Sequence, residues 1–213
     1  MNELNVTLHN TAEVLYHTQR NSNGPWLNPP LQLTSGMRRD RLISSLAGGF
    51  NPMLDITSTR SSDGVIHTIY ITDTNKLYYM TLSVATNRIL TAPIDLTTYF
   101  PELADWRTDN VSMKRVSSVF IGSDLHVIAL MSDNTIRQYI NTNGNWSRGT
   151  IQPESLTLNA GNITINDIDC FILVNSMNTF LCIAFLNDKF LTRANFVLPN
   201  GVMSNLSNIP SFS

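Results

Sequence analysis

Two copies of one polar turn, each closing on a Trp, constrain the fold of this chain most strongly: NSNGPW at 21–26 and NTNGNW at 141–146. Asn and Gly tolerate the positive φ of tight hairpin turns, so Asn-Gly between strand-like runs predicts a β-hairpin. Four segments repeat one layout of apolar strand, polar turn, second strand, and a second turn ending in a large apolar residue. They span 4–26, 66–89, 125–146 and 170–190, and their closing residues are Trp26, Ile89, Trp146 and Phe190.

Short apolar runs before and after these segments extend each hairpin into a four-stranded antiparallel meander. Leading strands are expected at 54–59, 116–120 and 163–167, and following strands at 31–34, 92–96, 149–153 and 195–199. The first unit has no leading strand, whereas VMSNLSNI at 202–209 is a spare one. A ring closed by strands from both chain ends would complete the first unit and remove an exposed edge.

The pattern predicts a single all-β domain over 1–213, a β-propeller of four blades closed by the C-terminal strand. The expected units are 1–35, 53–100, 115–155 and 162–200, with the closing strand at 202–209. Residues 36–53 leave room for a fifth unit, although MRRDRLISSLAGG there resembles a helical turn or excursion. No long stretch has a 3.6-residue period, so little helix is expected.

Composition agrees with turn-rich β structure and excludes several classes of partner. Apolar residues make up 42% and charged residues 14%, and the formal net charge is −2. The one basic cluster, RRDR at 38–41, is interpreted as a solvated loop, because a nucleic-acid surface needs a broader basic stripe with aromatics. No apolar run approaches the ~18 residues that span a bilayer. The N-terminal residues do not have the pattern of a secretion signal, which predicts a cytoplasmic protein.

Two cysteines, Cys170 and Cys182, flank a predicted turn and are placed where they can face each other across a hairpin. Strand-pair geometry and a reducing compartment favour free, buried thiols over a disulfide.

The third unit, LHVIALMSDNTIRQYINTNGNWSRGTI, resembles a blade of the fungal and bacterial fucose-binding lectin propellers. In that family an Arg on the second strand and a Glu on the third hold the sugar hydroxyls, and an aromatic ring packs on the apolar face of the sugar. Aligning the turns puts the Arg positions at Val6, Thr68, Val127 and Phe171, and the Glu positions at His17, Tyr79, Gln138 and Cys182. The resemblance thus implies the lectin fold without the sugar-binding Arg/Glu pairs.

Candidate ligand-binding residues follow from the repeat and from this resemblance. They are His17, Trp26, Tyr79, Gln138, Trp146, His67 and His126. His67 and His126 fall at equivalent positions in the second and third units, where a solvated strand-start residue is the simpler interpretation. Both Trp residues are equally suited to packing, since Ile89 and Phe190 take their place in the other units.

No nucleophile, phosphate-loop, dinucleotide or metal-ligand motif is present, so no cofactor and no metal are predicted. The primary functional prediction is non-catalytic, lectin-like binding of a glycan or small polar ligand. A cofactor-free enzyme of fungal natural-product biosynthesis, of cyclase or cycloaddition type, is the first alternative. A protein-interaction scaffold is the second. The ligand, the presence of catalysis and the oligomeric state stay open at this point.

Overall fold

The computed structural model describes residues 3–9, 15–21, 31–32, 53–86, 88–100, 111–151, 165–174, 179–187, 190–197 and 203–205. Side chains are described within 54–86, 88–100, 111–151, 165–174 and 179–185. In this part of the chain, strands account for nearly all regular structure, and the one helical element is a short 3-10 turn, η1 (Leu96–Thr98). None of the described helical residues forms a helix long and apolar enough to cross a membrane.

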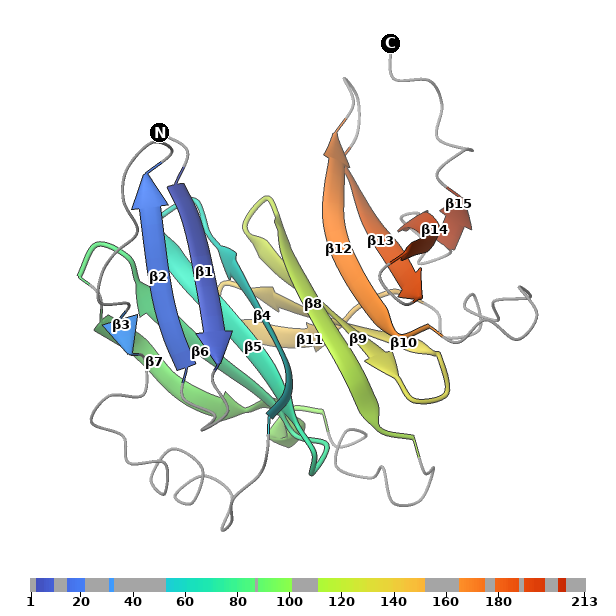
Figure 1. The fold of residues 1–213 in the computed structure, drawn as a ribbon, viewed down its shortest axis with the longest axis horizontal. Helices are drawn as coiled ribbons and strands as arrows, with labels where there is room; N and C mark the ends of the chain where they lie inside the picture. The colour runs from blue at the N-terminus through green and yellow to red at the C-terminus, as the bar shows by residue number, and fades with distance from the viewer. Residues whose placement is uncertain are drawn as a thin grey trace. The chain divides into compact units, whose positions relative to one another are not determined.

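The strands form four antiparallel sheets, each of which follows the order of the sequence (Figure 1). The first sheet contains β1 (Glu3–His9), β2 (Leu15–Asn21) and β3 (Leu31–Gln32). The second contains β4 (Met53–Arg60), β5 (Val65–Thr72), β6 (Leu77–Ser83) and β7 (Arg88–Asp95). The third contains β8 (Met113–Ile121), β9 (Asp124–Met131), β10 (Ile136–Thr142) and β11 (Asn145–Arg148). The fourth contains β12 (Asp167–Val174), β13 (Thr179–Asn187), β14 (Phe190–Val197) and β15 (Met203–Asn205). The predicted four-stranded antiparallel meander is thereby confirmed for three of the sheets.

Asn and Gly reverse the chain where the sequence predicts. Asn75, Asn134 and Asn143 have positive φ, as does Gly144, and these conformations are the ones that tight turns demand. The NTNG turn joins β10 to β11, and the Gly144 N–H donates to Asn141 Oδ1 at 2.8 Å. Trp146 therefore lies inside β11, opposite Asn141. The strand predicted at 149–153 is wrong in its described part, because β11 ends at Arg148.

The fourth sheet is shifted by one strand from its predicted frame. Ile165 and Asn166 precede β12 without strand structure, so no separate leading strand forms there and β12 takes the first position. Phe190 consequently begins the third strand instead of closing a turn. The sheet then needs a fourth strand, and β15 supplies it by pairing with β14. The prediction that this C-terminal strand completes the first sheet is therefore wrong for residues 203–205.

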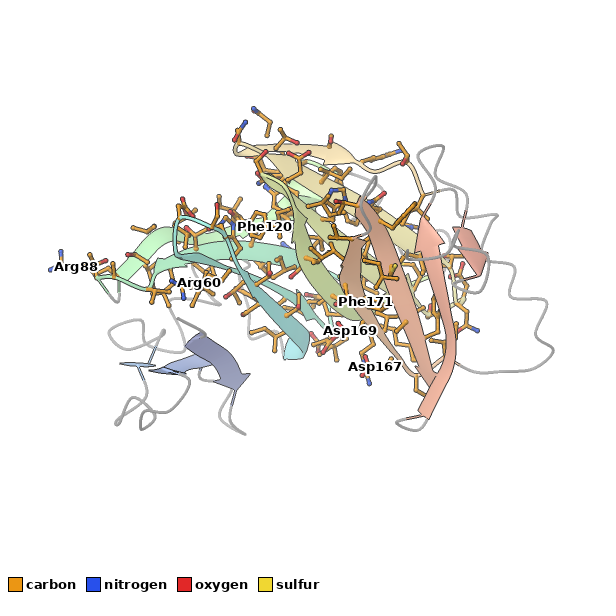
Figure 2. All side chains as sticks on the ribbon, turned by 90° about the horizontal axis from the view of Figure 1, so that it is seen from above. Arg60, Arg88, Phe120, Asp167, Asp169 and Phe171 are labelled. Carbon is orange, nitrogen blue, oxygen red and sulfur yellow. The ribbon has the colours of Figure 1, made fainter. Side chains whose placement is uncertain are left out.

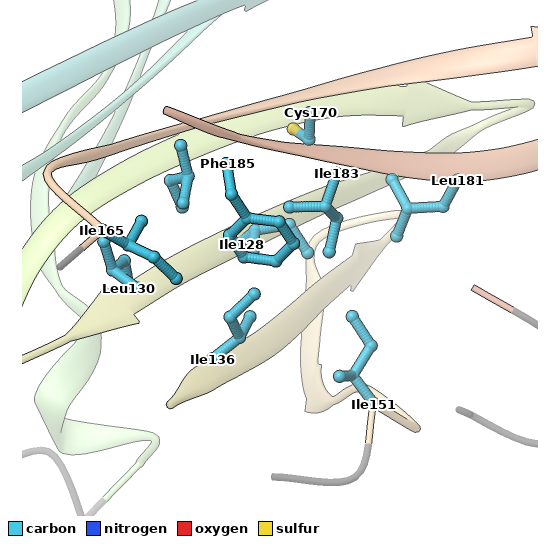
Figure 3. Packing of buried hydrophobic residues seen from close by; sticks show 10 residues of the cluster. Ile128, Leu130, Ile136, Ile151, Ile165, Cys170, Leu181, Ile183 and Phe185 are labelled. Atoms are coloured by element: carbon cyan, nitrogen blue, oxygen red, sulfur yellow. The ribbon is translucent and has the colours of Figure 1, made fainter. Parts of the chain in front are cut away.

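The chain divides into two compact units, Met1–Leu96 and Thr97–Ser213. In the first unit, Ile66, Met80 and Leu82 form a small buried cluster on one face of the second sheet. In the second unit, β8 and β12 lie side by side, and a larger core fills the space between the third and fourth sheets (Figures 1 and 3). Its members are Ile128, Leu130, Ile136, Ile151, Ile165, Ile168, Cys170, Leu181, Ile183 and Phe185. The prediction of one domain over the whole chain stays a prediction.

Polar contacts also join β8 to β12. The Ser117 hydroxyl donates to Asp169 Oδ1 and accepts from the Cys170 N–H, each at 3.0 Å. Lys114 Nζ donates to the carbonyl of Ile165 at 2.5 Å. Figure 2 shows Asp167, Asp169 and Phe171 following one another along β12, as their alternate positions on one face of the strand require.

Both cysteines are free and buried, as predicted. They do not face each other, because Cys170 pairs with Ile183 and Cys182 with Phe171, which turns the two thiols to opposite faces of the sheet.

Candidate functional site

In the second sheet, His67 and Tyr79 meet across β5 and β6. His67 pairs with Thr81, and Tyr79 pairs with Ile69, so the two side chains are diagonal neighbours on one face. His67 Nδ1 lies 2.8 Å from the Tyr79 hydroxyl. The ring centroids are 5.8 Å apart at an interplanar angle of 37°. Tyr79 is buried and His67 is half-buried, so this pair stands at the margin between core and solvent.

In the third sheet, His126 and Gln138 meet at the same place across β9 and β10. His126 pairs with Ile140 and Gln138 with Ile128, which makes these residues diagonal neighbours too. Gln138 Nε2 lies 2.9 Å from His126 Nδ1. The residues of both pairs are twelve positions apart in the chain, so the two sheets place one histidine and one third-strand partner identically.

A segment after β11 completes the third-sheet pair. The Ile151 N–H donates to Gln138 Oε1 at 3.3 Å, and the Gly149 N–H donates to the Gln138 carbonyl at 2.8 Å. A Cβ on residue 149 would fall 2.1 Å from Gln138 Oε1 and 2.4 Å from its Cγ. The backbone can pass over the Gln138 side chain only because residue 149 is Gly.

The register shows which side chains share a face with Tyr79 and Gln138. Thr68 pairs with Met80 and Val127 with Tyr139, so Thr68 and Val127 point to the opposite faces from Tyr79 and Gln138. A one-residue slip moves every side chain of a strand to the other face. Thr68 and Val127, which the resemblance aligns with the family's Arg, therefore do not share a face with Tyr79 and Gln138, and the alignment itself stays a prediction.

The residues that do face these partners are His67 and His126. In the first sheet the same diagonal is occupied by Asn5 and His17, from the pairing of Asn5 with Gln19 and of His17 with Thr7. Phe171 and Cys182 pair directly, but across the first and second strands of their sheet, so the fourth sheet has no equivalent of the predicted pair there.

The two described pairs are electrically neutral near pH 7. Burial lowers the pKa of His67, against a smaller opposing effect of Asp63. Burial likewise lowers the pKa of His126, against Asp124. Burial raises the pKa of Tyr79 to about 12, so its hydroxyl keeps the proton. Each pair thus offers uncharged hydrogen-bonding groups, which suit hydroxyl and carbonyl oxygens.

The structure brings four of the seven predicted site residues together in two pairs, His67 with Tyr79 and His126 with Gln138. Trp146 is half-buried on the face of the third sheet opposite to Gln138, since Asn141, its partner, alternates with Ile140. His17 lies in β2, and its side chain is outside the described residues, as is all of Trp26. No group of three metal-ligating side chains occurs among the described residues.

Sequence reasoning missed the links from Gln138 to Gly149 and Ile151. Both depend on where the chain passes after β11, which no local pattern reports. The link from each histidine to its partner had a signal in the sequence, because the equal spacing of His67 to Tyr79 and of His126 to Gln138 is visible once the turns are aligned.

Similar solved structures include a fucose-specific lectin and two further proteins. The Aleuria aurantia fucose-specific lectin matches with a TM-score of 0.54 at 12% identity, covering 95% of this chain and 59% of that one. AofleA from Arthrobotrys oligospora matches with a TM-score of 0.52 at 10% identity, covering 95% and 52%. The SapL1 lectin, solved with alpha methyl fucoside, matches with a TM-score of 0.51 at 15% identity, covering 95% and 58%.

This chain therefore spans between half and three fifths of the length of those proteins. At these identities the likeness shows the fold alone, and that fold is the predicted β-propeller. The number of blades stays a prediction. No protein-family model matches the sequence, and a search of curated proteins finds no match.

Proposed function

From this propeller fold, we propose that the chain is a lectin-like protein that binds a carbohydrate at its diagonal pairs, His67/Tyr79 and His126/Gln138. The observation that carries the proposal is the recurrence of one pair geometry in two sheets. A structural histidine needs no counterpart in a neighbouring sheet, whereas repeated binding sites on a repeated scaffold place equivalent groups at equivalent positions.

The register supports this placement. Each histidine lies one residue before the position that the lectin resemblance aligns with an Arg, and on the same face as Tyr79 or Gln138, which it aligns with a Glu. Replacement of a charged pair by neutral groups removes the charge-assisted hydrogen bonds that make such sites strong. We therefore expect weak binding that does not follow the usual fucose geometry.

The test is a glycan array followed by calorimetry with the best ligand. Removal of one neutral hydrogen bond weakens binding by about 0.5–1.5 kcal/mol, which is roughly a two- to twelvefold rise in Kd. His67→Ala and His126→Ala are expected to lower affinity or stoichiometry, each at its own sheet. Thr86→Ala and Thr142→Ala, at exposed positions of the same two sheets, are the controls and are expected to bind as the parent does.

The proposal fails if the array is blank, or if the double variant His67→Ala/His126→Ala keeps the affinity and stoichiometry of the parent. The enzyme and scaffold alternatives from the sequence are supported by no observation in the described residues.

A further inference from the structure

Gln138 has its amide orientation fixed by the backbone. Oε1 accepts the Ile151 N–H, so the other end of the carboxamide, which faces His126 Nδ1, is the NH₂ group. An amide NH₂ only donates hydrogen bonds. His126 Nδ1 must therefore be the acceptor.

A neutral imidazole carries one N–H, so a histidine that accepts at Nδ1 carries its proton on Nε2. No hydrogen bond to that Nε2 occurs within the described part of the chain. The third-sheet pair consequently presents an N–H donor at the histidine and needs an acceptor oxygen from a ligand.

The partner in the second-sheet pair is a hydroxyl instead of an amide. The Tyr79 hydroxyl both donates and accepts, so its hydrogen bond with His67 Nδ1 forms with either neutral tautomer. It also survives protonation of His67, because the hydroxyl oxygen then accepts the Nδ1–H. A protonated His126 has no such option, because its Nδ1–H would meet the Gln138 NH₂, and turning the amide over would oppose the same NH₂ to the Ile151 N–H.

We propose that Gln138 is a positioning residue that holds His126 as the Nε2–H tautomer, so that the third-sheet pair selects a ligand acceptor oxygen and comes apart when His126 is protonated. The second-sheet pair tolerates both protonation states. The part about ligands rests on the proposed function, whereas the tautomer and its titration do not.

The titratable groups around His126 do not reverse this behaviour. Asp124 lies two residues away on the same strand face, and its charge partly opposes the effect of burial on the pKa of His126. β8 faces His126 with Val119, and the same face of β8 carries Arg115, Ser117 and Ile121.

β12, which packs beside β9, turns Cys170 to the shared core and keeps Asp167 and Asp169 on its other face. The side chains of β13 in that core, Leu181, Ile183 and Phe185, are apolar. Within the described residues, Asp124 and Arg115 are thus the charged groups on the same face as the imidazole, and Asp169 reaches that face through its hydrogen bond with Ser117.

Long-range ¹H–¹⁵N spectra of the imidazole rings test the proposal on the protein alone. We expect His126 Nδ1 to give the shift of an unprotonated nitrogen and Nε2 that of a protonated one at about pH 7.5. On titration to about pH 4, His126 should protonate below its ordinary 6.5 and below His67. An Nδ1–H tautomer, a mixture of tautomers, or a midpoint equal to that of His67 would overturn the proposal.

Gln138→Glu is the decisive variant, because a carboxylate of the same shape accepts from both Ile151 and a protonated His126. We expect the His126 midpoint to rise by roughly one pH unit or more. A midpoint that does not rise contradicts the positioning role. If the variant does not fold, the tautomer measurement on the parent protein decides alone. A blank glycan array together with the expected tautomer would contradict the proposed function, but it would still support the positioning role of Gln138.

Discussion

The second and third sheets share one plan and differ in what completes it. Both place a histidine on the second strand and its partner two positions off the direct pair on the third strand. In the second sheet the partner is a hydroxyl that adapts to either role. In the third sheet it is an amide whose two ends are already assigned, one to His126 and one to Ile151. The comparison teaches that, at an identical backbone position, a hydroxyl partner accepts either protonation state of the histidine, whereas an amide whose oxygen already accepts a backbone N–H does not.

The largest effect is expected from Phe185→Ala, which empties the core that the third sheet shares with the fourth. Phe185 is fully buried there, so its truncation should lower the free energy of unfolding by about 3–5 kcal/mol. Chemical denaturation measures it, with Ile183→Val as the matched conservative change at about 0.5–1.5 kcal/mol. A loss no larger than that of the control would mean that this core does not support the third sheet.

Gly149→Ala should disturb the contact between His126 and Gln138, because residue 149 lies against the Gln138 side chain. The added Cβ collides with the Gln138 side chain, and overpacking of this kind costs about 1–3 kcal/mol. Gly64→Ala in the second sheet is the matched control, since a Cβ there comes no closer than 3.4 Å to the flexible end of Arg60 and meets only the strain of positive φ. Both variants are compared by denaturation and by the His126 ring signals. Only Gly149→Ala should move those signals, and a His126 spectrum unchanged in that variant would contradict the close approach.

Removal of the polar group from the partner of each histidine should lower stability by different amounts in the two sheets. Gln138→Leu leaves the buried Ile151 N–H without its acceptor, which costs about 1–3 kcal/mol. Loss of the hydrogen bond with His67 in Tyr79→Phe costs about 0.5–1.5 kcal/mol. Denaturation midpoints of the two variants, measured side by side at about pH 7.5, give the ranking. Equal losses would show that the Ile151 contact adds nothing to the third-sheet pair.

The smallest effect is expected from pH. Both histidines have a pKa below 6.5 in the folded protein, because burial disfavours the charged ring, so the unfolded chain takes up protons first as pH falls. Stability is therefore complete above about pH 6.5 and declines as pH falls through the lowered folded values. The decline between about pH 7.5 and 5.5 should shrink more in His126→Gln than in His67→Gln, because only His126 loses its partner on protonation. Denaturation midpoints at both pH values measure it, and a midpoint that rises with acid would contradict the assignment.

Sequence reasoning succeeded where local patterns determine structure. The strands of the second and third sheets follow from apolar runs separated by Asn and Gly, and Asn75, Asn134 and Asn143 do adopt the positive φ that such turns require. Each strand of the fourth sheet was assigned one position too late in the order of the sheet. Polar segments of similar composition follow both its first and its second strand, so the sequence does not tell them apart.

The candidate site was predicted in part. The resemblance aligned Thr68 and Val127 with the family's Arg, whereas the side chains on the same face as Tyr79 and Gln138 are those of His67 and His126, one residue earlier in each strand. Ile69 and Ile71 share a face with His67 and not with Thr68, as the alternation of a strand requires. The contribution of Gly149 was beyond prediction, because it depends on one backbone segment crossing a side chain from another strand.

The buried thiols have a practical consequence for anyone who labels this molecule. Burial raises the pKa of Cys170 to about 12 and that of Cys182 to about 11. Since the thiolate is the reactive species, neither residue should compete for an alkylating dye at neutral pH. A single cysteine introduced at exposed Thr86 would thus carry a fluorophore selectively on the natural background, and would report from the sheet that holds His67.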